Sequence, residues 1–105
     1  MESLSAVYVT ASSKEEAEKI GKEIVSRKLA ACANICGDVR SFYWWENKVD
    51  SSNEAVILFK TKESLFPELE KAVKELHSYA CPCIVSFPIG AASDGFAEWI
   101  IKNTL

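Results

Sequence analysis

The sequence alternates between two hydrophobic periods, and the order of those periods constrains the fold more than any other feature. Segments rich in β-branched and aromatic residues indicate strands, whereas apolar residues at every third or fourth position indicate amphipathic helices. On this basis we expect strands at residues 5–11, 31–45, 55–59 and 83–89, helices at residues 13–28 and 63–77, and a tail helix from Ser93 or Asp94. The predicted order is therefore βαββαβ followed by a helix.

This order predicts an α+β fold of the ferredoxin-like type, an antiparallel sheet with both main helices on one face. Local signals support several of the boundaries. Ser13 and Glu16 have the spacing of a capping box at the start of the first helix. Gly37 and Asp38 predict a bend or bulge in the long second strand. The polar residues 46–53 predict the turn of a hairpin between the second and third strands.

Length and composition exclude several classes of protein. The 105 residues suffice for a single domain, which we expect to span residues 1–105. No apolar run approaches the ~20 residues of a membrane-spanning helix. The net charge of −3 and the lack of clustered Lys and Arg argue against binding to nucleic acid. Because the first residues also lack the basic start of a secretory signal, we expect a cytoplasmic protein that binds neither nucleic acid nor a membrane.

Two apolar segments predict that the chain associates with copies of itself. Residues 55–59, Ala-Val-Ile-Leu-Phe, are apolar on both faces of the third strand, so both faces of the sheet need a cover. The aromatic run at residues 42–45 places two rings on each face of its strand. Exposed rings in such numbers mark an interface. The alternative is that the tail helix shields the second face and leaves one tryptophan exposed.

Several separate motifs follow one another over nearly the whole chain. They are Leu29-Ala30-Ala31-Cys32-Ala33-Asn34, Ser41-Phe42-Tyr43-Trp44-Trp45-Glu46 with Lys48, Phe59-Lys60-Thr61, Glu75-Leu76-His77 with Tyr79, and Trp99. In sequence and order these motifs resemble the CutA divalent-cation-tolerance family. The resemblance implies a homotrimer, related in architecture to PII-type signalling proteins, whose strand edges pair between subunits. It also implies a role in metal tolerance, with copper binding as a family property, and it suggests Glu54 and His77 as metal ligands.

The chain departs from the family pattern after the second helix. The family usually reads His-Pro-Tyr-Glu-x-Pro-Glu there, whereas this chain reads His77-Ser78-Tyr79-Ala80-Cys81-Pro82-Cys83. Two carboxylates are thus absent, and the thiols of Cys81 and Cys83 stand near their places. A cysteine that some members carry in the first strand is replaced in the region of Val9. Thiolates select soft ions, so copper or zinc is the expected metal.

The cysteines and the histidine each allow a structural and a functional interpretation. For the four cysteines, the favoured interpretation is buried, inert thiols. The alternative is a soft-metal site at Cys81 and Cys83, which a trimer could bring close to Cys32 and Cys36. For His77, the favoured role is to complement the dipole and free carbonyls at the end of the second helix, and the alternative is a ligand role with Glu54.

Nothing in the sequence points to catalysis. It contains no nucleophile elbow, phosphate-binding loop, H-E-x-x-H motif or paired acid and base, so we expect a protein that is not an enzyme and has no certain cofactor. Two function classes remain. One is a trimer that binds a metal ion or a small ligand at clefts between subunits. The other is a trimeric scaffold or signalling protein that recruits partner proteins without binding metal.

Overall fold

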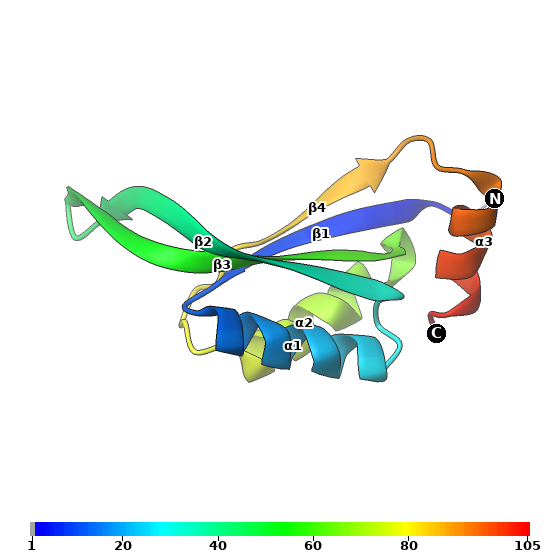
Figure 1. Ribbon diagram of the computed structural model, residues 1–105, viewed down its shortest axis with the longest axis horizontal. Helices are drawn as coiled ribbons and strands as arrows, with labels where there is room; N and C mark the ends of the chain where they lie inside the picture. The colour runs from blue at the N-terminus through cyan, green and yellow to red at the C-terminus, as the bar shows by residue number, and fades with distance from the viewer. Residues whose placement is uncertain (1) are drawn as a thin grey trace.

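A computed structural model describes residues 2–105, which form a four-stranded sheet with two helices packed on it and a third helix at one end (Figure 1). The predicted α+β order is confirmed. The strands are β1 (Leu4–Ala11), β2 (Cys32–Trp45), β3 (Lys48–Lys62) and β4 (Ile84–Ile89), and the helices are α1 (Lys14–Ser26), α2 (Phe66–Leu76), preceded by the 3₁₀ turn η1 (Glu63–Leu65), and α3 (Asp94–Lys102).

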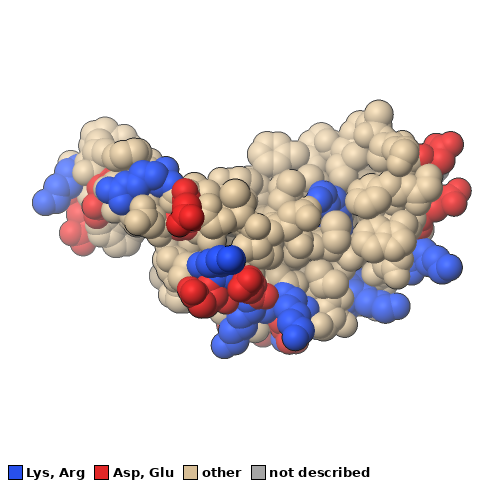
Figure 2. Space-filling view, viewed as in Figure 1, with Lys and Arg blue, Asp and Glu red and all other residues tan. Residues whose placement is uncertain are grey.

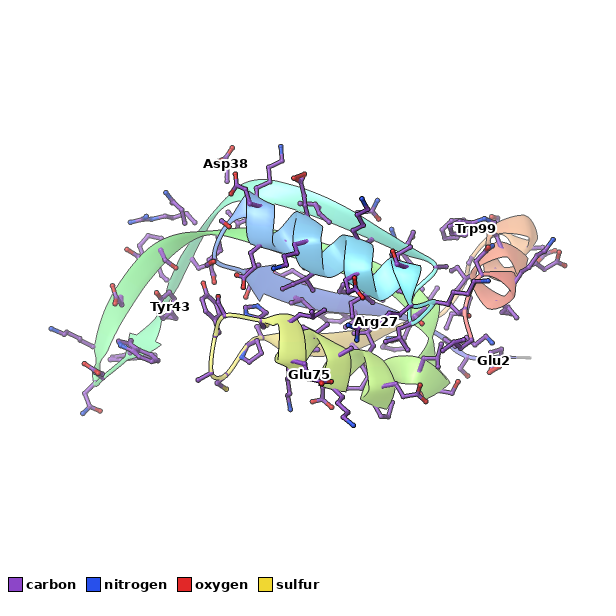
Figure 3. The ribbon with its side chains drawn as sticks, turned by 90° about the horizontal axis from the view of Figure 1, so that it is seen from below. Glu2, Arg27, Asp38, Tyr43, Glu75 and Trp99 are labelled. Atoms are coloured by element: carbon purple, nitrogen blue, oxygen red, sulfur yellow. The ribbon has the colours of Figure 1, made fainter. Side chains whose placement is uncertain are left out.

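The sheet has the strand order β2-β3-β1-β4, and every neighbouring pair is antiparallel. Helices α1 and α2 lie side by side on the same face of this sheet, as Figures 1 and 3 show from two directions. This is the ferredoxin-like arrangement that the sequence predicts. Within residues 2–105, the two outer strands, β2 and β4, each leave one edge without a partner.

The core lies between the sheet and the two helices. Alternate residues of β1 and β3, among them Val7, Val9, Ile57 and Phe59, point to the helices and are fully buried. They meet the apolar faces of α1 and α2, because a period of two in the strands and one of 3.6 in the helices each gather apolar side chains on one side. The residues between them on the same strands point to the opposite, helix-free face.

The hairpin between β2 and β3 is longer and its turn tighter than predicted. The predicted eight-residue turn at residues 46–53 is wrong, because only Glu46 and Asn47 connect the strands and β3 already begins at Lys48. Both turn residues have positive φ, 49° and 65°, as a type I′ turn requires. The two strands therefore extend past the helices as a projecting hairpin arm, residues 42–51, visible at the left of Figure 1.

The predicted irregularity in β2 is confirmed at the expected place. The pairing with β3 shifts between Cys36 and Val39, which identifies a bulge at Gly37 and Asp38. It is Asp38 that has the positive φ, 58°, and not the glycine. Asp tolerates this left-handed conformation better than most residues.

Helix α3 covers only one end of the helix-free face. Its Ile100 is buried in a small cluster with Leu4 and Ala31, with Ile89 packed against it. Phe96 and Trp99 of the same helix stack on each other, with ring centroids 5.5 Å apart, and stay about two-fifths exposed. The tail helix therefore does not shield the centre of the face.

Large apolar side chains remain exposed in two places on this molecule. They include Phe42 at 70% and Trp44 at 74% relative exposure on the hairpin arm, and Phe87 at 53% on β4. Figure 2 shows that the surface above the sheet is largely uncharged, whereas charged side chains gather below it over the helices and near the tip of the arm. We refer to the side of the sheet opposite α1 and α2 as the open face.

Candidate functional site

The most densely bonded cluster of polar side chains lies where the loop after α2 crosses the end of the sheet. This loop, residues 77–83, joins α2 to β4. His77, its first residue, is the C-cap of α2 and has a side chain with no exposed surface. His77 Nε2 lies 2.7 Å from the carbonyl oxygen of Thr10, and Nδ1 accepts a 3.0 Å hydrogen bond from the backbone N–H of Tyr79. Both ring nitrogens are therefore occupied.

These partners fix the chemical state of the ring. A carbonyl oxygen can only accept, so Nε2 of His77 carries the hydrogen, and Nδ1 must offer its lone pair to the N–H of Tyr79. The ring is thus the neutral Nε2–H tautomer. In this form His77 has no free lone pair for a metal ion. The role expected for it at the helix end is also different in detail, because it bonds a carbonyl of β1 and not those of α2.

Glu16 holds the same loop from the side of α1. The predicted capping box is half right: Ser13 Oγ accepts from the N–H of Glu16 at 3.1 Å, but the carboxylate does not return to Ser13. Its Oε1 accepts from Ser12, from the N–H at 2.9 Å and from the hydroxyl at 2.7 Å. Its Oε2 accepts from the N–H of Ser78 at 2.8 Å, across 62 residues of sequence.

The electrostatics of Glu16 follow from these bonds. Partial burial works to raise the pKa of this carboxyl, but the hydrogen bonds from Ser12 and Ser78 outweigh it and lower the pKa to about 2. Glu16 is therefore ionised at neutral pH. Its link to Ser78 has no sequence signal, because the two residues lie in different elements far apart in the chain.

A hydrogen bond between Tyr79 and Glu54 also holds the loop, in addition to the bonds of His77 and Glu16. The Tyr79 hydroxyl donates a 2.8 Å hydrogen bond to Glu54 Oε2, and the tyrosine ring lies 4.8 Å from the ring of His77. Desolvation, and then the bond to Glu54, raise the pKa of Tyr79 to about 12. Glu54 lies within β3, opposite Val39 of β2, and not at the strand start as the sequence predicts.

Cys81 and Cys83 lie in the part of the loop that immediately precedes β4. Both are exposed, as is Cys36, and Cys32 is half-buried. The favoured interpretation of four buried cysteines is thus wrong for the single chain. All four are free thiols. Although the residue is exposed, partial desolvation of its thiol and then the nearby charge of Glu54 raise the pKa of Cys83. The side chains of Cys83 and Glu54 therefore lie in the same region.

The four predicted metal ligands are only partly brought together. His77 is buried with both nitrogens engaged, Glu54 bonds Tyr79, and the two cysteines lie further along the loop. Between residues 2 and 105, no group of three or more His, Cys, Asp or Glu side chains is placed to hold a metal ion.

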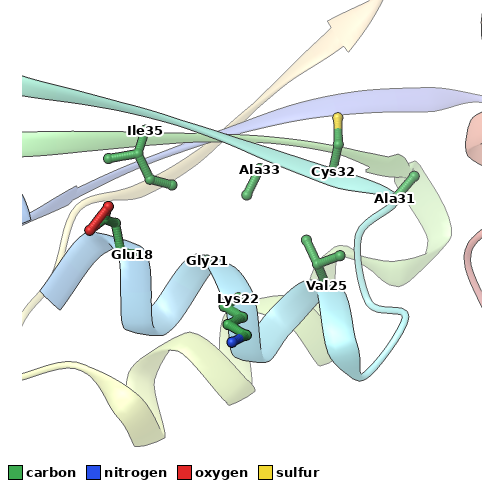
Figure 4. A pocket seen from close by; sticks show the side chains of 8 residues that line it. All are labelled: Glu18, Gly21, Lys22, Val25, Ala31, Cys32, Ala33 and Ile35. Atoms are coloured by element: carbon green, nitrogen blue, oxygen red, sulfur yellow. The ribbon is translucent and has the colours of Figure 1, made fainter. Parts of the chain in front are cut away.

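Two shallow hollows flank α1. The first, of about 470 Å³, lies between α1 and the edge of β2 (Figure 4). Its apolar lining includes Val25, Ala33 and Ile35, with Glu18 and Lys22 at the helix side. The second, of about 400 Å³, lies at the start of α1 beside the β2 bulge. Its lining residues are Ser12, Ser13, Lys14, Ile35, Gly37, Asp38, Asn53 and Glu54.

Comparison with known proteins places the chain in a family. The family model described as "CutA1 divalent ion tolerance protein" matches residues 5–103. The chain belongs to the CutA1 family. A divalent-cation tolerance protein CutA of Archaeoglobus fulgidus is 44% identical over 94 residues, which cover 90% of this chain and 91% of that protein. The corresponding CutA protein of Pyrococcus horikoshii is 38% identical over 93% of this chain and 95% of its own length.

Solved CutA structures share the fold. The crystal structure of CutA1 from Oryza sativa has a TM-score of 0.97 at 38% identity, covering 99% of this chain and 95% of that one. The A. fulgidus CutA structure has a TM-score of 0.93 at 41% identity, covering 95% and 97%. The resemblance to the CutA family is thus confirmed over residues 5–103.

The same comparison contradicts the location predicted for the protein within the cell. The A. fulgidus structure is described as a periplasmic divalent cation tolerance protein. The prediction of a cytoplasmic location, inferred from the first residues alone, is therefore wrong as an expectation for a CutA protein. None of the helices described in residues 2–105 is long and apolar enough to span a membrane.

Proposed function

We propose that this chain works as a homotrimer of CutA type that binds a metal ion, copper among the candidates, at clefts between its subunits, without catalysing a reaction. The observation that carries the proposal is the apolar open face of the sheet. Tyr8, Val56 and Leu58 are half-buried there, and Val85 and Phe87 are more than two-fifths exposed. A surface of this kind on one chain favours burial against another copy.

The edges of the sheet support a ring of subunits. Each chain presents two different unpaired edges, β2 and β4. Contact between unlike surfaces is head-to-tail, and such contacts close into a ring when the rotation permits. Pairing would also remove the exposed edges that otherwise promote aggregation. Three subunits is the number that resemblance to the family implies.

The hairpin arm supplies a second surface that a neighbour would cover. Phe42, Trp44 and Val49 lie on one face of the arm by the register of β2 with β3, and Tyr43 and Trp45 lie on the other. Each aromatic ring hides about 150–250 Å² when buried. The arm reaches beyond its own helices (Figure 1), so another chain is the natural partner for these rings.

The proposed metal role rests on the family and on the donors near the loop. The family model and the relatives carry the description of divalent ion or divalent-cation tolerance. Glu54, Cys81 and Cys83 are the donors of this chain that lie near the loop and the bulge. Since one chain does not gather three such donors, the cleft between chains is where a fuller set would form.

Sedimentation and metal uptake test the two parts of the proposal separately. We expect a mass three times the 11.6 kDa subunit in dilute buffer, and a reduced mass for Trp44→Glu, with Lys48→Glu at the exposed arm end as control. A wild-type monomer at micromolar concentration would contradict the trimer. Dialysis against Zn²⁺ or Cu²⁺ followed by elemental analysis should give a fixed ratio of metal to chain, and no retained metal would contradict the metal role.

The alternative function is a trimeric scaffold or signalling protein that recruits other proteins and binds no metal. The stacked, exposed pair of Phe96 and Trp99 on α3 favours it, because the pair lies apart from the hairpin arm. A correct trimer with no retained metal would support this alternative.

A further inference from the structure

The two cysteines of the loop after α2 stand on a short bridge between two fixed points. Tyr79 is fixed on one side of the bridge and Ile84 on the other, so residues 80–83 form the whole span. The first point is held by the bonds of residues 77–79, which include Ser78 to Glu16 and Tyr79 to Glu54. The second is held by β4, whose Ile84 pairs with Val9 of β1.

The bridge itself has little freedom. Pro82 lies between the two cysteines, and its ring fixes φ near −65°. Residues two apart along a chain have Cα atoms no more than about 7 Å from each other. Cys81 and Cys83 are therefore held close together whatever the rest of the molecule does, and one small ion is within reach of both side chains.

Both thiols are available to a ligand. Each is exposed, and within the described part of the chain neither sulfur takes part in a hydrogen bond, whereas Cys36 Sγ contacts the carbonyl of Gly37. Cys32 and Cys36 offer no comparable pair. Four residues along a strand separate their Cα atoms by about 13 Å, which is too far for one ion.

We propose that Cys81 and Cys83 of one chain bind a soft cation, Cu(I) in the first place, through their two thiolates. The inference rests on the proposed metal role and names its ion class and ligands. Thiolates select Cu(I) over hard ions such as Mg²⁺ and Ca²⁺, which prefer oxygen. Two ligands are enough for Cu(I), whereas Zn²⁺ is usually held by four. His77, with both nitrogens engaged, is not a ligand.

Binding releases protons in a defined number. Cu⁺ and two thiols give a copper bis-thiolate with one negative charge and two protons, with no change in oxidation state. Affinity is therefore expected to rise with pH until both thiols are ionised in the complex.

Competition with bicinchoninate under anaerobic, reducing conditions tests the site on the whole protein. Wild type should remove one Cu(I) per chain from the coloured bicinchoninate complex. Cys81→Ser with Cys83→Ser should lower the Cu(I) affinity by at least a hundredfold, and each single variant should also lower it. The matched control, Cys32→Ser with Cys36→Ser, should bind as wild type does.

Three results would overturn the inference, and one of them would leave the proposed function standing. Unchanged Cu(I) affinity in the Cys81/Cys83 double variant would refute the two-thiolate site, as would equal losses in the control pair. Wild type that takes no Cu(I) but retains Zn²⁺ or Cu²⁺ would refute the site and leave the proposed metal role standing. Circular dichroism of each variant shows that a lost site is not a lost fold, since both substituted residues are exposed.

Discussion

The hydroxyl of Tyr79 donates a 2.8 Å hydrogen bond to Glu54 Oε2 and so ties the loop after α2 to the middle of β3. Its backbone N–H meanwhile bonds the buried ring of His77, which in turn bonds β1 through Thr10. One residue of the loop is thus connected to both central strands of the sheet. The cysteines two and four positions further on depend on this anchor for their place.

Tyr79→Phe should loosen the loop and simplify the alkaline titration. Desolvation and the bond to Glu54 raise the pKa of Tyr79 to about 12. The raised pKa means that its contribution to stability is complete below pH 10 and is lost as the pH rises to about 12. Tyrosinate absorbance against pH should lack the ionisation near pH 12 in Tyr79→Phe.

Glu54→Gln supplies the matched test of this cause. It keeps the side-chain size but removes the charge, so the ionisation of Tyr79 should move to lower pH. An alkaline titration that Glu54→Gln leaves unchanged would contradict the assignment of the shift to this carboxylate.

The same hydrogen bond should contribute to stability. Denaturant unfolding of Tyr79→Phe near neutral pH should show that the free energy of unfolding falls by about 1–2 kcal/mol, as for a hydrogen bond to a charged group.

Glu16→Gln should destabilise the fold in a pH-dependent way. Its pKa is lowered from 4.5 to about 2, so the carboxylate stabilises the folded state above about pH 4.5 and loses this effect as the pH falls to about 2. The side chain is only 15% exposed, and we expect a loss of about 1–3 kcal/mol at neutral pH. Urea unfolding at fixed protein concentration should show that the free energies of unfolding of the wild type and of Glu16→Gln become equal at acid pH.

The control for this substitution is Glu15→Gln, one residue earlier on the exposed side of α1. It has the same helix-dipole environment but none of the three hydrogen bonds of Glu16. Its effect should stay within about 0.5 kcal/mol. Equal losses in both variants would mean that the dipole, and not the link to Ser12 and Ser78, accounts for the effect.

Gly21→Val should test the close packing of α1 on β2. A Cβ at Gly21 would lie 3.0 Å from Ile35 Cδ1 and 3.3 Å from the Cβ of Ala33, so a larger branched side chain forces α1 away from β2. We expect a loss of about 1–3 kcal/mol from overpacking. Gly95→Ala in α3, where a Cβ meets nothing within 4 Å, should instead gain up to about 1 kcal/mol from helix propensity.

Asn47→Gly should stabilise the hairpin arm. Asn47 and Glu46 both have positive φ, which glycine adopts without strain, and glycine is the preferred second residue of a type I′ turn. The larger conformational entropy of glycine in the unfolded chain offsets part of this relief of strain, so the expected gain is at most about 0.5 kcal/mol. Thermal unfolding should show a higher midpoint, whereas Asn53→Gly, within β3 and bonded to Arg40 at 3.1 Å, should lower it.

The elements themselves could be predicted because their signals are local. The capping serine Ser13 is visible at the start of α1, and the periods of two and 3.6 separate strands from helices without knowledge of the fold. The hairpin turn was misplaced for the opposite reason. Residues 50–53 have turn-like composition, yet cross-strand pairing with β2 holds them in β3, and pairing over a long ladder outweighs local preference.

The sequence by itself determined the order of strands and helices and the family, because these depend on patterns between near neighbours or on short motifs that lie in order along the chain. Only the tertiary structure decided the state of the candidate site. His77 meets Thr10 across 67 residues and Glu16 meets Ser78 across 62, so whether the histidine has a free lone pair depends on how the loop packs against the sheet. Hydrogen-bond partners buried by folding leave no periodic trace in a sequence, since a single polar contact constrains only the two residues that make it.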